Sequence, residues 1–353
     1  MAEDITIVIP THERHQYLSR ILDYYVSQRP DCPIIVCDSS KDEFKDRDKF
    51  NGVRYLHFPN GDFSYKLREG LECVQSRYCV MCADDDFIVP SAIEKCVSFL
   101  DSHSDYSSVQ GKYVSFVYKP KIELRQMYVR NYDIAVSSQF PGKRIVQQFN
   151  PYMHQFYSVH RIENLLATFG YAFDSRLNGN LIELLIAMIA ALNGKHEILP
   201  MFYSARERLP FSAGATSDSV EMIDASPEYK HEYNSLLEIV TNHLKLKGQL
   251  DYEDARECVL KAMDTYLNIF IPEMRTKRGE IKTFIKHIIP DLMLPTVRLI
   301  HRQLRHFIGL DYSRKDFDRY FTQFGTEGKR NLDTILQFVK KHNIRPSDSV
   351  ENI

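Results

Sequence analysis

Three consecutive aspartates, Asp84, Asp85 and Asp86, are the residues of this sequence best suited to chemistry. Adjacent carboxylates repel one another, so a fold tolerates three of them either in free solvent or around a cation. Apolar residues flank the triplet at 80–82 and 87–89, which disfavours a solvated loop. Mg²⁺ and Mn²⁺ prefer carboxylate oxygens and share their coordination shell with substrate phosphates. The triplet therefore predicts a divalent metal site that faces a phosphate group.

The triplet also has a purely structural explanation. Pro90 is typical of the first position of a helix, and acids just before a helix are stabilised by the positive end of its dipole. Asp86 and its neighbours would then serve only the start of that helix. The strand expected directly before the triplet favours the metal site.

Short apolar runs alternate with helical patterns over the first 110 residues. Runs rich in β-branched and aromatic residues predict strands at 5–9, 34–37, 53–58, 78–82 and 109–117. Apolar residues at helical spacing predict helices around 18–25, 67–74 and 93–100. This alternation predicts an α/β fold with a mostly parallel sheet flanked by helices.

Polar residues follow three of the predicted strands directly. They are Pro10 to Arg14, Asp38 to Ser40, and the aspartate triplet. In an open parallel sheet, ligands bind beyond the carboxyl ends of the strands. We therefore expect these acids and hydroxyls to converge on one edge of the sheet.

The composition bounds the class of protein. With 353 residues, of which 44% are hydrophobic, the chain has enough length for two domains. We expect one at 1–215 and a mainly helical one at 225–345, where strand patterns give way to successive helices. The net charge of -2, from 45 basic and 47 acidic residues, provides no overall attraction to nucleic acid.

Neither the N-terminus nor the cysteines indicate secretion. Glu3 and Asp4 precede the first apolar run, which is unlike a signal peptide, and the apolar stretch 181–192 is too short to cross a membrane. The seven cysteines are scattered, and Cys79 and Cys82 should point to opposite faces of one strand, so we expect reduced structural thiols. The expected location is the cytoplasm.

Three segments, Ile5–Thr11, Val36–Ser40 and Tyr78–Asp86, together resemble the family 2 glycosyltransferases of GT-A fold. The resemblance covers about residues 4 to 210 and is strongest before 115. It implies transfer of a sugar from a nucleoside diphosphate donor to a hydroxyl of a glycan or lipid-linked acceptor, with Mn²⁺ or Mg²⁺ as cofactor.

The resemblance also implies roles for individual residues. Pro10, Thr11 and Glu13 would contact the nucleotide, and Asp38 would recognise the nucleobase. The D-x-D motif of the family corresponds to Asp84 and Asp86, with Asp86 as metal ligand, Asp84 as its ribose-binding or metal-binding neighbour, and Asp85 beside the donor.

A cation is expected near the diphosphate. Lys66 and Arg68 occupy the place of a loosely matching basic motif before Gly70, and we prefer Lys66 at the start of its helix. The alternative is an ordinary exposed lysine.

The catalytic base is the least defined part of the site. Family members commonly have an acidic pair before an apolar helix, and the Glu-Asp dipeptide is missing here. Glu183 and Asp174 are the remaining carboxylates, and we prefer Glu183. Glu183 would alternatively form a capping box with Asn180 as the N-cap. His154 lies on the expected acceptor side, as a contact or as packing.

The sequence also bears on two other functions and on one further surface. Nucleotidyl transfer usually needs a glycine-rich loop after the first strand, and residues 10–13 contain no glycine. A non-catalytic sugar-nucleotide-binding scaffold is compatible with the missing acidic pair. The basic amphipathic segment 275–306 is a candidate contact with another pathway enzyme or with the inner face of the membrane, where the protein would be peripheral.

Overall fold

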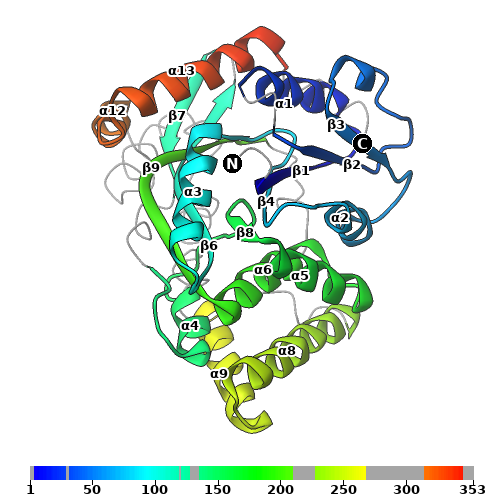
Figure 1. The fold of residues 1–353 in the computed structure, drawn as a ribbon, viewed down its shortest axis with the longest axis vertical. Coiled ribbons are helices and arrows are strands. Elements are labelled where there is room, and N and C mark those ends of the chain that lie inside the picture. The colour runs from blue at the N-terminus through cyan, green and yellow to red at the C-terminus, as the bar shows by residue number, and fades with distance from the viewer. Residues whose placement is uncertain are drawn as a thin grey trace, which may run out of the picture.

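The computed structural model describes residues 4–28, 32–118, 121–127, 135–209, 227–267 and 314–344. Its centre is a nine-stranded sheet in the order β3-β2-β1-β4-β8-β6-β9-β5, with β7 beside β6 (Figure 1). The strands are β1 (Ile5–Thr11), β2 (Ile34–Asp38), β3 (Val53–His57), β4 (Tyr78–Met81), β5 (Phe87–Ile88), β6 (Tyr106–Tyr118), β7 (Ile122–Gln126), β8 (Val159–Arg161) and β9 (Lys195–Glu207).

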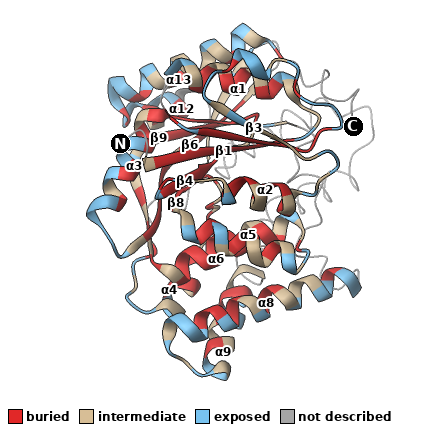
Figure 2. Cartoon of the chain, turned by 45° about the vertical axis from the view of Figure 1, so that its right-hand side comes forward, coloured by how far each residue is buried: buried red, intermediate tan, exposed pale blue. Residues whose placement is uncertain are grey.

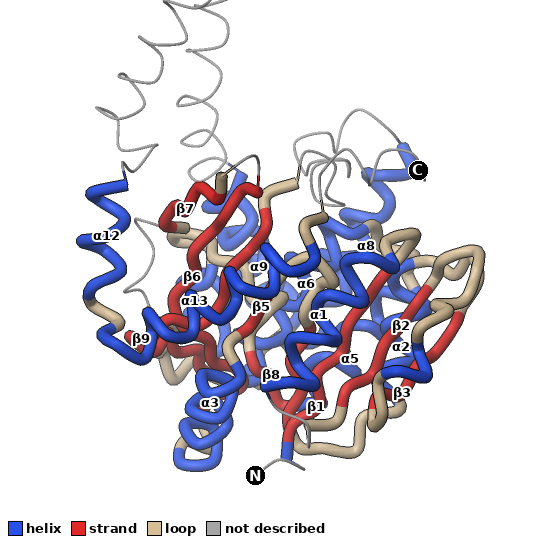
Figure 3. Tube along the Cα trace, turned by 90° about the horizontal axis from the view of Figure 1, so that it is seen from above, coloured by secondary structure: helices blue, strands red, loops and turns tan. Residues whose placement is uncertain are grey.

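The first four strands are parallel, as the alternation of strands and helices predicts. Their register places Thr11 beside Asp38 and Asp38 beside His57. Beyond β4 the sheet is mixed, because β8 runs antiparallel to both of its neighbours, β4 and β6. Figure 3 shows β1, β2 and β3 side by side, with β6 and β7 at the other side of the sheet.

The described residues up to 209 form six α-helices beside these strands and one short 3-10 helix, η2 (Arg47–Lys49). The six α-helices are α1 (His15–Gln28), α2 (Phe63–Glu72), α3 (Pro90–Ser102), α4 (Pro141–Gln148), α5 (Ile162–Asp174) and α6 (Gly179–Asn193). Pro90 occupies the first turn of α3, as predicted. One hydrophobic core joins the sheet to α1 and α3, and a second joins its other face to α2, α5 and α6.

Two cysteines, one in β4 and one directly after it, lie in the two different cores. Cys79 belongs to the core on the α2 side and Cys82 to the core on the α1 side. Both are fully buried and free of disulfide bonds. The prediction of structural thiols on opposite faces is therefore confirmed.

Helix α6 is buried along almost its whole length, as its apolar sequence predicts. Its N-cap is Asn178, whose side chain accepts hydrogen bonds from the backbone of Asn180 and Leu181. The expected capping box with Asn180 as N-cap is wrong, because the helix begins two residues earlier. Glu183 consequently lies beyond the first turn and has no capping role.

The C-terminal helices pack on both sides of the sheet (Figure 2). Helices α8 (Pro227–Gly248) and α9 (Tyr252–Thr265) pack against α4 and α6. Helices α12 (Arg314–Thr322) and α13 (Gly325–His342) cover the opposite face, where α13 contacts α1 and β9. The expected boundary between 215 and 225 and the basic segment 275–306 lie outside the described residues.

Among the described residues, no helix combines the length and the apolar character that a membrane crossing requires.

Candidate active site

Residues from the ends of β1 and β4 form the centre of the predicted site. Thr11, the last residue of β1, donates its hydroxyl hydrogen bond to Asp84 Oδ2 at 2.6 Å. Arg14, three residues later, contacts Asp84 Oδ1 and Asp85 Oδ2, both at 2.7 Å. Because β1 and β4 are adjacent and parallel, these groups meet at one edge of the sheet.

All three aspartates of the triplet are buried, with exposed fractions of 5% or less. Burial raises the pKa of Asp84 and Asp86 above the ordinary aspartate value, and the positive charges of Arg14 and Arg206 act against this rise. A solvated acidic loop is excluded, because each carboxylate is held by a protein cation.

Asp86 is held from a different side than Asp84. Its Oδ2 accepts hydrogen bonds from Tyr157 at 2.6 Å and from Arg206 Nε at 3.0 Å. Its Oδ1 accepts from the backbone amide of Glu207 at 2.7 Å. Arg206 and Glu207 are the last two residues of β9, so this distant strand fixes the third aspartate in place.

A second buried arginine links the triplet to β9. Arg20 of α1 donates to the carbonyl oxygen of Asp85 at 3.0 Å and to Glu207 Oε2 at 2.7 Å. Both side chains of this ion pair are at most 1% exposed. Burial raises the pKa of Glu207 to about 6, against the lowering effect of Arg20. Breaking a buried pair of this kind leaves an uncompensated charge, so it fixes α1 relative to the triplet.

Asp38 lies at the end of β2 and is completely buried. Its Oδ2 accepts hydrogen bonds from His15 Nε2 at 2.8 Å and from Tyr55 at 2.7 Å, and its Oδ1 accepts from the amide of Ser40 at 2.8 Å. Burial alone would raise the pKa of Asp38, but these hydrogen bonds outweigh it and lower the pKa to about 2. In this arrangement Asp38 holds His15 and Tyr55, which are partly exposed.

The loop after β1 is tied to the loop after β2. Glu13 has a left-handed backbone with φ of 52°, its amide donates to Ser40 Oγ at 2.7 Å, and its carboxylate accepts from the amide of Lys41 at 2.6 Å. Pro10 is buried within β1 beside Cys37. Of the three residues predicted to contact the nucleotide, Thr11 and Glu13 therefore have side chains in the polar network.

Lys66 is buried, with 3% of its surface exposed, so the interpretation as an exposed helix lysine is wrong. Its ammonium group donates to the carbonyl oxygen of Thr11 at 2.6 Å and to Ser39 Oγ at 2.9 Å. Burial lowers the pKa of Lys66, and the charges of Asp84 and Asp38 act against this effect. Lys66 thus lies between the two acidic parts of the site.

Arg68 is placed differently from Lys66. It stacks on Phe173 with 4.0 Å between the guanidinium carbon and the ring centroid, and it pairs with Glu69 on the same helix. It therefore occupies the interface between α2 and the end of α5.

Glu183 contacts segment 154–157, which also contacts the triplet. Its carboxylate contacts Nδ1 of His154, and both side chains are about one third exposed, at 30% and 35%. Burial and the positive charge of Arg206 lower the pKa of His154. Tyr157, three residues further along the chain, contacts Asp86. Residues 154–157 thus connect Glu183 with the third aspartate.

Asp174 lies apart from this arrangement. It is the last residue of α5 and is exposed. Its charge acts on Arg68 at the outer side of α2. The structure therefore brings Glu183, and not Asp174, toward the triplet.

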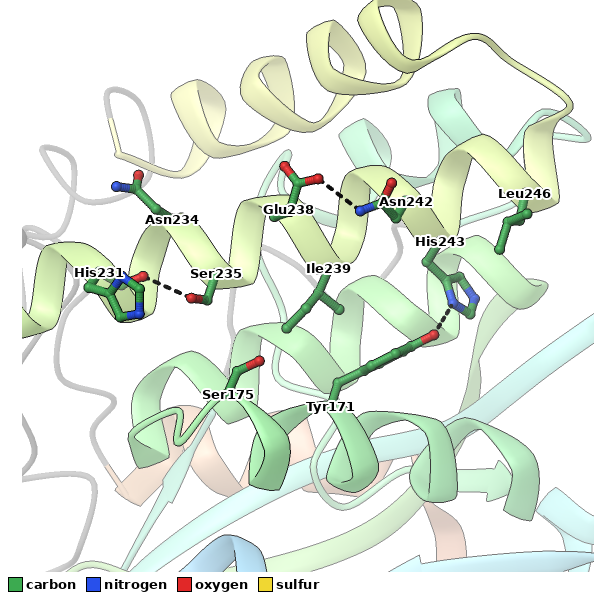
Figure 4. Close-up of a pocket in the computed structure, with 10 residues that line it drawn as sticks. All are labelled: Tyr171, Ser175, His231, Asn234, Ser235, Glu238, Ile239, Asn242, His243 and Leu246. Atoms are coloured by element: carbon green, nitrogen blue, oxygen red, sulfur yellow. Dashed lines mark hydrogen bonds between the residues drawn. The ribbon is translucent and has the colours of Figure 1, made fainter.

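A pocket of about 530 Å³ lies between α5 and α8 (Figure 4). None of the residues predicted for the donor site lines it. Several of its polar groups bond within the protein: Glu238 accepts from Asn242 and Tyr252, and His243 bonds to Tyr171 and Asn193. These groups are therefore not directed together at a ligand in the pocket.

The comparisons with known proteins bear on this geometry. Residues 6–164 match the model of glycosyl transferase family 2, and this match includes β1 from Thr6 onward, the triplet and Tyr157. This part of the chain is therefore similar to glycosyl transferase family 2. A search of curated proteins found no match.

Solved structures of similar fold include TarS of S. aureus. Residues 1–349 of TarS in complex with UDP-GlcNAc give a TM-score of 0.52 at 13% identity, covering 96% of this chain and 90% of that one. A longer TarS structure gives a TM-score of 0.49 at 14% identity and covers 91% of this chain, which spans 55% of its length. At such low identity the likeness shows the shared fold alone.

The site contains residues that the sequence patterns did not assign. Arg14 lies in the polar stretch directly after the first strand. Its place in the sequence could therefore have identified it as a site residue. Tyr157 and Arg206 are 71 and 120 residues away from Asp86. No local pattern links residues so far apart, and only the folded chain brings them together.

Proposed function

We propose that the chain transfers a sugar from a nucleoside diphosphate donor to a hydroxyl of a glycan or lipid-linked acceptor. The observation that carries this proposal is one continuous polar network at the strand ends. It runs from Asp38 through the Thr11 loop to Asp84, and from Asp85 through Arg20 and Glu207 to Asp86. A network at this edge of the sheet is where an α/β fold binds a nucleotide.

The chemistry of the triplet fits a divalent metal ion. Among the described residues, no group of three or more histidine, cysteine, aspartate or glutamate side chains forms a complete ligand set. Mg²⁺ needs only one or two carboxylates when substrate phosphates and water complete its shell. Family 2 typically uses a divalent metal, and we propose Mn²⁺ or Mg²⁺ with Asp86 as ligand and Asp84 as neighbour. When bound, the ion would neutralise charge on the departing diphosphate.

The remaining residues would bind and orient the donor. Lys66 places a positive charge between Asp38 and Asp84, where it would attract a diphosphate. Pro10, Thr11 and Glu13 would shape the nucleotide side of the site, and Asp85 would be held beside the donor by Arg14. Asp38 would act on the nucleobase through His15 and Tyr55, which it orients.

Glu183 is the proposed base if transfer inverts the sugar configuration. Its contact with His154 would hold the carboxylate in position to accept a proton from the acceptor hydroxyl. Asp174 is the second candidate, and its exposed position beside α2 supports it less. A retaining reaction would need no base at this place.

The test is thermal stabilisation against a panel of nucleoside diphosphates with Mn²⁺, beginning with UDP because a TarS structure of similar fold contains UDP-GlcNAc. We expect one nucleotide to raise the melting temperature in a Mn²⁺-dependent way. Asp86→Asn should abolish this shift, because the amide keeps the volume but loses the charge that holds the metal. Asp105→Asn, at an exposed ion pair with Lys195, is the control and should keep the shift.

Two results would contradict the proposal. If no nucleotide shifts the melting temperature of the folded wild type, the donor site is not where we place it. If a nucleotide binds but neither transfer nor hydrolysis of the matching sugar nucleotide is detected, the chain is a non-catalytic binding scaffold.

A further inference from the structure

Arg206 is the cation that holds Asp86. Its Nε lies 3.0 Å from Asp86 Oδ2, the same oxygen that accepts from Tyr157. The guanidinium also lies over the ring of Tyr157, with 4.6 Å between its carbon and the centroid. The carboxylate proposed to bind the metal therefore has a protein cation beside it already.

Arg206 is the most exposed of the three arginines that bind the acidic groups of the site. Its side chain is 29% exposed, compared with 19% for Arg14 and 0% for Arg20. Arg14 is fixed by two carboxylates, and Arg20 by a buried carboxylate and a backbone carbonyl. Arg206 thus holds Asp86 with a side chain that is partly exposed.

The charges of the site have a consequence for the order of binding. Four acids, namely the triplet and Glu207, are paired with Arg14, Arg20 and Arg206. A divalent ion that approached Asp86 alone would meet the positive charge of Arg206 at close range in a buried setting. A diphosphate changes this situation, because its oxygens can replace the carboxylate of Asp86 as hydrogen-bond acceptors for the guanidinium of Arg206.

We propose that Arg206 is the resident counter-ion of Asp86 and keeps a metal ion from binding there alone. The diphosphate of the donor draws Arg206 away from the carboxylate, so that metal and nucleotide bind together. Arg206 is thereby a positioning residue that couples the two ligands. This inference rests on the proposed function, because it needs a nucleoside diphosphate at the triplet.

The experiment measures Mn²⁺ binding to the full chain by the electron paramagnetic resonance signal of free Mn²⁺. Titrations are made with and without the diphosphate selected by the thermal panel. For the wild type we expect the nucleotide to tighten Mn²⁺ binding by at least about tenfold, within the usual range of coupling between two ligands. For Arg206→Gln we expect Mn²⁺ alone to bind about tenfold more tightly than to the wild type, and the coupling to shrink.

Matched variants separate the charge of Arg206 from its packing. Arg206→Met removes the charge but keeps aliphatic contact with Tyr157, so it should behave as Arg206→Gln does. Arg206→Lys keeps the charge and should exclude Mn²⁺ as the wild type does. Arg125→Gln is the control, because it removes a strand arginine of similar exposure, 30%, that pairs with Glu123. It should leave the binding of Mn²⁺ alone unchanged.

The inference is overturned if wild type binds Mn²⁺ equally tightly with and without nucleotide. It is also overturned if the charge-removing variants bind Mn²⁺ alone no better than wild type does. Failure of the wild type to bind any nucleotide would instead overturn the proposed function. The two failures are thus distinguishable in the same set of titrations.

Discussion

At the residue scale, the buried carboxylate of Asp38 orients the side chains around it. Its two oxygens are occupied by His15, Tyr55 and the Ser40 amide. Tyr55 stacks on His57 with 6.3 Å between ring centroids, and His15 lies 5.4 Å from Phe44. The carboxylate therefore orients rings at the rim of the sheet, where a flat nucleobase would find aromatic surfaces.

The pairing of His15 with Asp38 gives a pH-dependent contribution to stability. The hydrogen bond to Asp38 is the main cause that raises the pKa of His15, and the charges of Glu13 and Asp84 add to it. A folded-state pKa above the unfolded value stabilises the fold below the unfolded pKa, and this contribution is lost as pH rises through the folded pKa. Asp38, with a pKa of about 2, stays ionised throughout this range.

We therefore expect His15→Gln to lower the melting temperature by about 2 °C at pH 6, and by clearly less at pH 9. Differential scanning calorimetry of both proteins at the two pH values checks this. His103→Gln, which changes an exposed histidine at the end of α3, is the control. An equal loss at both pH values would show that protonation of His15 has no part in the effect.

At the element scale, helix α2 lies close against strand β2 at Gly70. A methyl group at this position would overlap Sγ of Cys37 on β2. Cys37 immediately precedes Asp38, and Lys66 is one turn before Gly70 on the helix. The small residue thus allows α2 to lie close enough for Lys66 to reach Thr11 and Ser39.

Gly70→Ala should consequently destabilise the protein by about 1–3 kcal/mol, the usual cost of an overfilled core. Helix propensity alone would predict the opposite sign, a gain of about 0.5–1 kcal/mol. Gly170→Ala in α5 is the matched control, because a methyl group there meets no atom within 4 Å and the gain should appear. Urea denaturation measures both changes.

The double variant Gly70→Ala with Cys37→Ala tests the cause. Removing the sulfur makes room for the new methyl group, so the two substitutions should be non-additive and part of the loss should be recovered. Strict additivity of the two effects would contradict a direct contact between these residues.

At the scale of the whole molecule, the C-terminal helices complete the packing of the N-terminal fold. Ile335 and Val339 of α13 are fully buried in the same core as β1 and α1. Phe338 meets Tyr24 of α1 edge to face, with 5.5 Å between ring centroids. Helices α8 and α9 belong to the core on the other face. The hydrophobic core on each side of the sheet therefore includes residues beyond position 225.

Ile335→Ala should lower the free energy of unfolding by about 2–5 kcal/mol, the usual cost of deleting a buried branched side chain. Because α13 shares a core with the sheet, we expect the main unfolding transition itself to shift. Glu327→Gln, which breaks an exposed ion pair with Lys95, should cost at most about 1 kcal/mol. A separate early transition in Ile335→Ala, with the main one unmoved, would indicate an independent C-terminal domain.

The sequence by itself determined those strands and helix ends that depend on interactions between neighbouring residues. The apolar runs of β1 to β4 and the proline that opens α3 express local conformational preferences, and both appear in the structure at the predicted places. The start of α6 was misplaced by two residues, because Asn178 and Asn180 are both suitable caps and only the folded backbone selects one.

Tertiary structure alone decided which charges meet. Asp86 pairs with Arg206 across 120 residues, and Arg20 pairs with Glu207 across 187. It also decided that Lys66 is buried and that Glu183 contacts His154. Sequence patterns carry periodicity and chemical type, whereas the pairing of distant ions depends on the order of strands in the sheet. That order brings β9 to the triplet, and no single segment of the chain encodes it.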